Sequence, residues 1–368
     1  MDYPRSWVEI DLNLLRFNLN SIFKKLPHKC GFIGVVKASA YGHGAPQVGL
    51  ALEKLGAKML AVATIEEAIE LRNAKIKIPI LLFGGVIKSW IPGIIKYNIT
   101  PTVFDYDIVE NLSKSTKNKV PVHLKIDTGM NRFGVKNLRD AVALAKKISN
   151  LKNIKLEGVY THFADASNKD LTYTINQLKK FEKLIDLLKR AKINPKYIHC
   201  ANSTAAIRGI NDGCNLVRPG IALYGYLPAK VDSGVKLKPI LSWYARILQV
   251  KKLKKGEKLG YDLIYTAKRD STIAVISVGY ADGFHRDPNF KKVIVRKKFA
   301  SIVGKVCMDT SMIDISNIGD VKVGDKVTVI GSDGKLTQTA NDLVLQTNSR
   351  IYEILTSIGP RIERKYNK

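Results

Sequence analysis

The sequence has no long apolar segment and no paired cysteine or histidine motif. Its N-terminus, MDYPRSWVEIDL, lacks a basic flank followed by an apolar stretch, and no run approaches the roughly 20 apolar residues that span a membrane. We therefore expect a cytoplasmic protein without a membrane partner. The four cysteines show no CxxC spacing and the six histidines no HExxH spacing, which predicts reduced thiols and no bound metal.

Acidic residues are scarce relative to basic ones, since 32 Asp and Glu stand against 60 Lys and Arg, a net charge of +28. Such a charge attracts polyanions such as nucleic acid or an acidic membrane without selecting one of them. The densest basic clusters, KKLKKGEK from Lys251 and KKVIVRKK from Lys291, mix with apolar and turn residues as solvated strand faces do. We expect no nucleic-acid partner, and a polyanion-binding role stays open as an alternative.

The pattern along the 368 residues indicates an α/β barrel domain followed by a second, mostly β domain. Short β-branched runs first alternate with amphipathic helical segments, the pattern of βα units around a parallel sheet, and eight units predict a (β/α)8 barrel over residues 11–230. Residues 231–368 alternate as strands separated by turns, with PAKVDSGVK as the linker. The eight apolar runs are Phe32 to Val36, Met59 to Ala63, Ile80 to Phe83, Thr100 to Phe104, Val120 to Ile126, Leu156 to Tyr160, Tyr197 to Cys200, and Leu216 to Leu223.

Lys37 directly follows the first apolar run, in GFIGVVKASAYGHG. A lysine there is costly unless it is paired, and the glycines after it allow the backbone to approach a ligand closely. Desolvation lowers the pKa of a lysine and makes it a usable amine nucleophile for Schiff-base chemistry. Its position alone does not distinguish this role from the alternative, in which the Lys37 side chain simply extends into solvent at the barrel rim.

Polar residues and glycines follow the later predicted strands at their carboxyl ends. In a barrel these ends meet at the face that carries the active site, and the loops after the last two strands form the usual phosphate site. Ser203 and the backbone N–H groups near Gly220 suit a phosphate monoester. Taken singly, each residue also fits an ordinary structural role, and their joint placement with Lys37 favours an active site. The set is Lys125, Asp127, Arg132, Tyr160, His162, His199, Asn202, Ser203, Arg218, Gly220 and Ile221.

Several motifs in this order resemble the alanine racemase family. VVKASAYGHGA resembles its signature for the lysine that carries pyridoxal 5′-phosphate, and seven further motifs extend the resemblance over nearly the whole chain. The resemblance implies a cofactor-binding barrel followed by a β domain, with residues 1–10 packed against the latter. The further motifs are KIDTGMNRFG, YTHFA, HCANS, VRPGIALYG, LGYDLIYTA, VGYADGF and GKVCMDTSMIDI.

Racemisation needs one group to remove the Cα proton from one face and another to return a proton to the opposite face. The resemblance gives these roles to Lys37 and to Tyr261 of the partner subunit, so that a head-to-tail homodimer shares its active sites. A tyrosine has an unperturbed pKa near 10 and must be shifted toward the working pH before it acts as a base. Without the resemblance, Tyr261 would also fit an ordinary strand aromatic.

The resemblance also implies how cofactor and substrate are held. Arg218 would face the pyridine nitrogen, and because a guanidinium keeps its proton, the ring would stay a weak electron sink, which selects racemisation. Arg132, a good bidentate carboxylate ligand, would bind the substrate together with Met308 of the partner subunit and Tyr280. Lys125 would be carbamylated and orient Arg132, or it is an ordinary rim lysine. The further cofactor contacts are Tyr41, His162, Asn202, Ser203, Gly220 and Ile221, and the supporting residues are Tyr160, His199 and Asp309.

Three alternatives remain beside an alanine racemase that supplies D-alanine for peptidoglycan. A barrel-type decarboxylase for basic amino acids would place an acid where Arg218 stands. A non-catalytic cofactor-binding barrel would lack the second domain and its motifs LGYDLIYTA and VCMD. A racemase of broader specificity, for serine or lysine, differs only in pocket volume. Alanine is expected because Tyr261, Tyr280 and Tyr352 would leave room for a methyl group.

Overall fold

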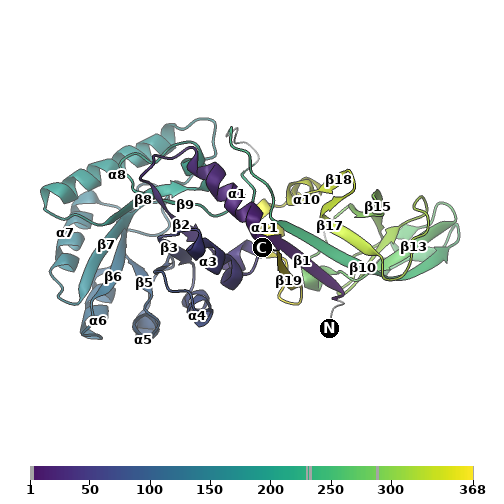
Figure 1. Cartoon of the computed structure of the whole chain (residues 1–368), viewed down its shortest axis with the longest axis horizontal. Helices are drawn as coiled ribbons and strands as arrows, with labels where there is room; N and C mark the ends of the chain where they lie inside the picture. The colour runs from purple at the N-terminus through teal and green to yellow at the C-terminus, as the bar shows by residue number, and fades with distance from the viewer. Residues whose placement is uncertain (1–3, 229–230, 232–233, 287–289, 368) are drawn as a thin grey trace. The chain divides into compact units, whose positions relative to one another are not determined.

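The computed structural model describes residues 4–228, 231, 234–286 and 290–367. Its contacts divide the chain into two units (Figure 1). The barrel unit comprises residues 15–40 and 44–238, and the β unit comprises the described residues up to 14, residues 41–43, and those from 239 onward. The predicted border at residues 230 and 231 and the PAKVDSGVK linker fall partly outside the described residues.

The barrel unit is a closed barrel of eight parallel strands, in the order β2 to β9, which confirms the predicted fold class. All residues of β3 and β4 are buried, as expected for parallel strands covered on both faces. Each of the eight apolar runs of the sequence overlaps one of these strands. The strands are β2 (Gly31–Val35), β3 (Met59–Val62), β4 (Ile80–Leu82), β5 (Thr100–Val103), β6 (Val120–Lys125), β7 (Ile154–Tyr160), β8 (Tyr197–Asn202) and β9 (Leu216–Arg218).

Amphipathic helices surround the barrel strands (Figure 1). In α7, Ala141, Leu144, Ala145 and Ile148 are buried, which is the i, i+3, i+4, i+7 spacing of one helix face. Asn137 caps the start of this helix, and its side chain accepts hydrogen bonds from the free backbone N–H groups of Arg139 and Asp140. The helices are α1 (Leu12–Phe23), α3 (Ala45–Lys54), α4 (Ile65–Asn73), η1 (Lys88–Trp90), α5 (Ile91–Lys96), α6 (Tyr106–Lys114), α7 (Leu138–Ser149), α8 (Thr172–Arg190) and α9 (Ser203–Ile207).

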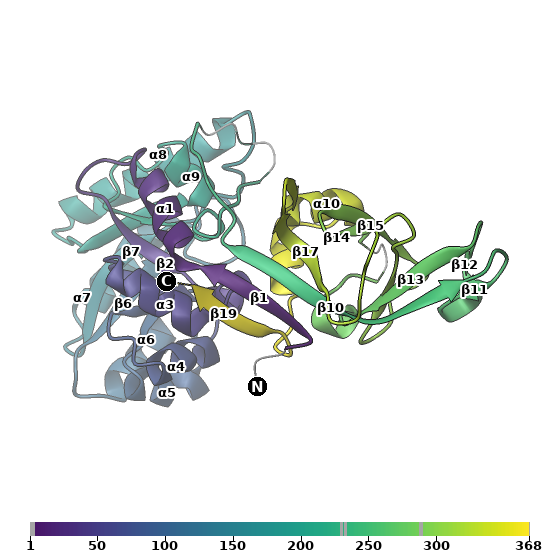
Figure 2. The same ribbon diagram turned by 45° about the vertical axis from the view of Figure 1, so that its right-hand side comes forward.

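The β unit is built on a nine-stranded sheet in the order β18-β17-β14-β15-β16-β13-β10-β1-β19. Its long strand β10 pairs antiparallel with β1, β13 and β17, and β1 also pairs in parallel with β19 (Figure 2). The first and last strands of the chain therefore lie side by side. The strands are β1 (Ser6–Asp11), β10 (Leu241–Leu253), β13 (Ser271–Ile276), β14 (Lys292–Val295), β15 (Lys298–Val303), β16 (Ser311–Asp314), β17 (Lys326–Asp333), β18 (Leu336–Gln338) and β19 (Glu363–Asn367).

A two-stranded ribbon and several short helices complete the β unit. The ribbon pairs β11 (Lys258–Leu259) with β12 (Tyr265–Thr266), and the short helix η2 (Tyr261–Leu263) forms its tip. The other helices are η3 (Tyr280–Asp282), α10 (Ala340–Thr347) and α11 (Ile351–Thr356). The tip and η3 both carry tyrosines that the sequence predicts for the site.

Candidate active site

Five strands of the barrel end at or next to residues of the predicted site. Lys125 and Tyr160 are the last residues of β6 and β7, Asn202 and Arg218 are the last residues of β8 and β9, and Lys37 follows just after β2. Because these strands are parallel members of one closed barrel, their carboxyl ends meet at one rim. The structure therefore brings this part of the predicted site together.

Lys37 opens a turn of unusual backbone conformation, α2 (Lys37–Tyr41). Ala38, Ser39, Ala40 and Tyr41 have φ angles of 51°, 52°, 53° and 54°. L-residues avoid this left-handed region, at a cost of roughly 1–2 kcal/mol each. The turn therefore holds backbone strain directly beside the lysine, which is a frequent property of functional sites.

Glu67, which the sequence analysis did not identify, ties this turn to the start of α4. Its Oε1 accepts the Ala38 N–H at 2.5 Å, and its Oε2 accepts the N–H groups of Ala63 at 2.7 Å and Thr64 at 3.2 Å. Glu67 also forms a capping box with Thr64. The sequence TIEE carries the capping-box signal for a helix start, but it contains nothing that indicates the contact with Ala38.

The surroundings of Lys37 disfavour its charged form. Burial, followed by the nearby charge of Arg132, lowers the pKa of Lys37, and Glu67 acts in the opposite direction. Arg132 itself is exposed. A lowered pKa increases the fraction of neutral amine, which is the nucleophilic form.

Arg218 is a buried cation with unusual hydrogen-bond partners. It is 3% exposed, and its Nη1 lies 3.0 Å from His199 Nδ1. Its Nη2 donates to the carbonyl oxygens of Thr161 and Cys200 and lies 3.1 Å from His162 Nδ1. Among the described residues no carboxylate pairs with Arg218, and none of its hydrogen bonds there involves Nε. Its Nε–H is thus left for a further acceptor.

Two histidines of the predicted site contact this arginine and are held neutral. Burial, and then the charge of Arg218, lowers the pKa of both His162 and His199 well below the usual value. Tyr160 stacks on His199 with ring centroids 4.7 Å apart, and its hydroxyl lies 2.8 Å from Thr102 Oγ1. Burial raises the pKa of Tyr160 to about 12. This cluster therefore stays uncharged around one permanent cation.

Lys125 is a second buried cation of the rim. It is 6% exposed, its Nζ lies 4.9 Å from the ring centroid of Tyr160, and it donates to the carbonyl oxygen of Ile126. Burial first, and then Arg218, lowers the pKa of Lys125 well below the usual value. Asp127 acts in the opposite direction, but its carboxylate already accepts the N–H groups of Gly129 and Asn131.

Ser203 and Gly220 meet at the ends of β8 and β9, as the sequence predicts. The Ser203 hydroxyl accepts the N–H of Gly220 at 2.8 Å and that of Ala222 at 3.3 Å. Asn202 caps the following short helix α9 by accepting the Ala205 N–H, and Ile221 is buried. Asn202 therefore has a local structural role here, whereas Ser203 lies among backbone N–H groups.

The remaining predicted residues belong to the β unit. Four of them are exposed there, namely Tyr261, Tyr280, Met308 and Asp309. Tyr261 is 63% exposed, at the tip of the β11–β12 ribbon, beside the exposed side chains of Leu263 and Ile264. Tyr280 and Met308 lie on adjoining loops, because the N–H groups of Tyr280 and Ala281 donate to the carbonyl oxygens of Cys307 and Met308.

Two ion pairs of Arg361 link the Met308 loop to the buried Asp282. Asp309 Oδ1 lies 2.7 Å from Arg361 Nη2, and Arg361 Nε lies 3.0 Å from a carboxylate oxygen of the buried Asp282. A Cβ atom at Gly279 would lie only 2.3 Å from the carbonyl oxygen of Met308. Because of this close approach, the loop requires glycine there.

Tyr41, predicted to hold the phosphate, lies beside a second tyrosine in the β unit. Its ring centroid is 6.2 Å from that of Tyr352, and burial raises the pKa of both hydroxyls. Tyr352, which the sequence predicts only near the substrate, therefore lies next to the residue predicted to hold the phosphate.

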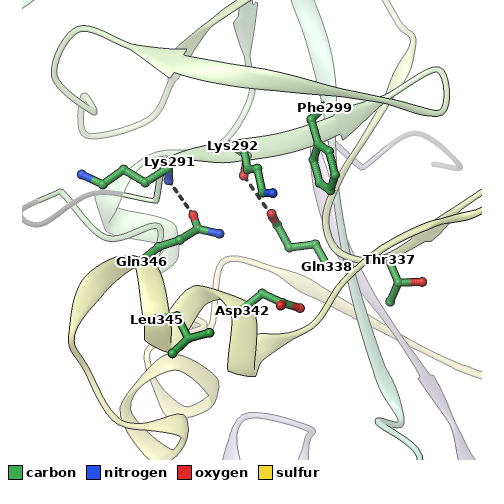
Figure 3. Close-up of a pocket in the computed structure, with 8 residues that line it drawn as sticks. All are labelled: Lys291, Lys292, Phe299, Thr337, Gln338, Asp342, Leu345 and Gln346. Carbon is green, nitrogen blue, oxygen red and sulfur yellow. Dashed lines mark hydrogen bonds between the residues drawn. The ribbon is translucent and has the colours of Figure 1, made fainter.

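The structure also contains a pocket apart from these residues. It has a volume of about 420 Å³ and lies within the β unit, between β14, β15 and α10 (Figure 3). Phe299 and Leu345 line it together with Gln338 and Gln346, and no predicted site residue is among the described residues around it. Within the described residues no group of three or more His, Cys, Asp or Glu side chains is arranged to hold a metal ion. No described helix is long and apolar enough to cross a membrane.

Comparison with known proteins covers both units. Residues 10–228 match the family model for the alanine racemase N-terminal domain, and residues 240–366 match that for the alanine racemase C-terminal domain. The chain belongs to the alanine racemase family. An alanine racemase of Halothermothrix orenii is 41% identical over 366 residues, which are 98% of this chain and 96% of the relative.

Solved structures agree with this assignment. The alanine racemase of Clostridium difficile 630 superposes with a TM-score of 0.95 at 36% identity, covering 100% of this chain and 97% of that one. A histidine racemase from Leuconostoc mesenteroides subsp. sake has a TM-score of 0.92 at 28% identity, covering 100% and 99%. The family resemblance and the amino-acid racemase class predicted from the sequence are confirmed. The fold is shared by racemases named for different substrates, so it does not by itself set side-chain specificity.

Proposed function

We propose that this chain is a pyridoxal-5′-phosphate dependent racemase that interconverts L- and D-alanine. The observation that carries the proposal is the barrel rim, which combines Lys37, a lysine of lowered pKa, with Arg218, a buried arginine that meets no described carboxylate. Membership in the alanine racemase family supports the same reaction.

The residues of the rim fit this cofactor. Lys37 would hold the cofactor through its amine, and the Ser203 hydroxyl with the neighbouring backbone N–H groups suits the phosphate. The Arg218 Nε–H suits the ring nitrogen as acceptor, because the hydrogen bonds that the structure describes for this side chain come from Nη1 and Nη2. When bound, the cofactor withdraws electrons from the substrate Cα and makes its proton more acidic.

Arg218 restricts which reaction follows. A guanidinium keeps its proton, so Arg218 would not donate one to the ring nitrogen, and the electron sink would stay weak. Arg218 would thereby favour return of a proton to Cα over decarboxylation and transamination. A decarboxylase would need an acid at this position, and the described partners of Arg218 are two histidines and two carbonyl oxygens.

Two groups of this chain would move the proton at Cα. Lys37 Nζ acts on one face, and the hydroxyl of Tyr261 from the partner subunit acts on the other. Tyr261 is 63% exposed, and Leu263 and Ile264 beside it are 55% and 61% exposed. Such a group of large side chains at a ribbon tip is typical of a surface that another molecule covers. We therefore propose a head-to-tail homodimer with shared active sites.

Arg132 would bind the substrate carboxylate, with Met308 and Tyr280 contributed by the partner subunit. Arg132 is exposed in the single chain, and its charge already acts on Lys37, which is consistent with a place above the reacting amine. A bidentate contact with a carboxylate fixes the orientation of the amino acid as well as its position. The tyrosines expected around the substrate side chain favour alanine.

The test is to add L-alanine in D₂O to the purified protein reconstituted with pyridoxal phosphate. We expect loss of optical activity together with deuterium at Cα, and neither change with Lys37→Ala. L-serine, L-lysine and L-histidine in parallel reactions measure the substrate range. Absence of exchange at Cα with L-alanine would contradict the proposal, and faster exchange with L-histidine would favour the specificity of the Leuconostoc relative. A cytoplasmic location and a supply of D-alanine for peptidoglycan stay predictions of the sequence.

A further inference from the structure

His123 is a histidine in the core of the barrel that the proposed reaction does not use. It lies in β6, is 0% exposed, and its Nδ1 is 2.9 Å from Nε2 of His199. His199 in turn contacts Arg218 through its other ring nitrogen, Nδ1, at 3.0 Å. The three side chains therefore form one hydrogen-bonded row from the barrel core to the rim.

The chemistry of arginine fixes the protons along this row. Arg218 has only N–H donors, so it donates from Nη1 and His199 Nδ1 must accept. A neutral histidine that accepts at Nδ1 carries its hydrogen on Nε2, and it donates that hydrogen to Nδ1 of His123. His123 then carries its own hydrogen on Nε2. Both rings are neutral, because burial lowers the pKa of His199 well below the usual value and that of His123 to about 3.

The row ends in a group that finds no partner among the described residues. His123 Nε2 is buried there without a hydrogen bond. An unsatisfied buried donor costs about 1–3 kcal/mol, which an apolar side chain in the same place would not incur. Packing alone therefore gives no reason for a histidine at this position.

The surrounding backbone makes room for this ring. The register between β6 and β7 shifts between Val122 and His123, as at a β-bulge. Gly158 lies opposite the ring and has no side chain. A Cβ atom at this position would lie only 2.5 Å from both Cε1 and Nδ1 of His123. The bulge and the glycine together allow the ring of His123 to point its Nδ1 toward Nε2 of His199.

We propose that His123 is a positioning residue that holds His199 in its Nε2–H form and so keeps an acceptor facing Arg218. Without the acceptor at His123, His199 can carry its hydrogen on Nδ1 instead. Two donors would then face each other at the contact with Arg218, and the guanidinium would move from its place. The consequence for catalysis rests on the proposed function, in which Arg218 faces the cofactor. The positions of the hydrogens on His123 and His199 do not depend on that function.

The test compares two substitutions of His123. His123→Leu fills similar space without an acceptor, and His123→Asn keeps an oxygen near the position of Nδ1. We expect His123→Leu to lower kcat about 10- to 100-fold with little change in KM, the usual range when a residue that orients a site group is lost. His123→Asn should restore most of the activity. Leu124→Ala, a truncation of the next buried residue of β6, controls for lost stability and should leave kcat unchanged.

Nitrogen-15 NMR of histidine-labelled protein without cofactor gives a readout that does not depend on activity. We expect His199 as the Nε2–H tautomer in the wild type, in His123→Asn and in Leu124→Ala, and a shift toward Nδ1–H in His123→Leu. An Nδ1–H tautomer of His199 in the wild type, or an unchanged tautomer in His123→Leu, would overturn the proposal. So would equal kcat losses in the Leu and Asn variants. A wild type without racemase activity would instead contradict the proposed function, and the tautomer result would still stand.

Discussion

Replacing Glu67 by glutamine tests how the strained turn after Lys37 is held. The carboxylate accepts three backbone N–H groups, from Ala38, Ala63 and Thr64. A glutamine has one carbonyl oxygen, so if it keeps the two bonds at the start of α4, its amide N–H₂ faces the Ala38 N–H. One hydrogen bond to a charged group is then lost, which is worth about 1.5–3 kcal/mol. The turn would lose its tie to α4 while still holding four left-handed residues.

For a barrel unit of this size we expect Glu67→Gln to lower Tm by roughly 3 to 12 °C, since 1 kcal/mol corresponds to about 2–4 °C. Activity should fall as well, because Lys37 begins the turn that relaxes. The matched control is Glu66→Gln, which removes the same charge from the same first turn of α4 at an exposed position. Thermal unfolding and the rate of L-alanine racemisation provide the two measurements. Equal effects of the two substitutions would refute the role of Glu67 in the turn.

The remaining predictions concern the proton donor, the dimer and the buried lysine. Tyr261→Phe should nearly abolish racemisation while the cofactor absorbance is retained, and near-normal turnover would remove Tyr261 from the mechanism. Leu263→Asp should convert the dimer to monomers in analytical ultracentrifugation without unfolding the chain, because Asp tolerates the φ of +51° at this position; an unchanged mass would place the interface elsewhere. Burial lowers the pKa of Lys125 in the folded state, so the unfolded state binds more protons and the stability contribution of this group rises with pH. Lys125→Met should therefore stabilise the apoprotein most below the folded pKa of Lys125, with a gain that shrinks toward pH 10, and a gain independent of pH would contradict a buried titrating amine.

Much of the barrel could be predicted because its signals are local. Each buried strand is a short apolar run, and the residue that ends it projects from a known face of the fold, so Lys37, Lys125 and Arg218 could be located by counting along the sequence. The pairing of Ser203 with Gly220 followed from the same rule. The role proposed for Tyr261, by contrast, came only from the family resemblance, because a tyrosine at a ribbon tip has no local feature that marks it as functional.

The supporting residues could not be predicted, because their contacts join segments far apart in the sequence. Glu67 contacts Ala38 across 29 positions, and His123 contacts His199 across 76. The register shift beside His123 gives no signal in the sequence. The same limit applies to residues 41–43, which the sequence places within the barrel and the contacts place in the β unit.

The rim carries more positive charge than its own acids offset. Lys37, Lys125, Arg132 and Arg218 take part in none of the ion pairs described for the chain, and Asp127, the acid nearest to Lys125, is engaged by backbone N–H groups. Arg132 is exposed, but burying the other three without partners costs free energy. Lys37 and Lys125 have a lowered pKa for this reason, whereas Arg218 keeps its charge and is stabilised by polar neighbours. A ligand with a phosphate, an acceptor nitrogen and a carboxylate would supply what each of these groups lacks. Binding of cofactor and substrate would then offset the free energy that these buried cations cost the fold, so the same residues that destabilise the protein alone would define the ligand that it binds.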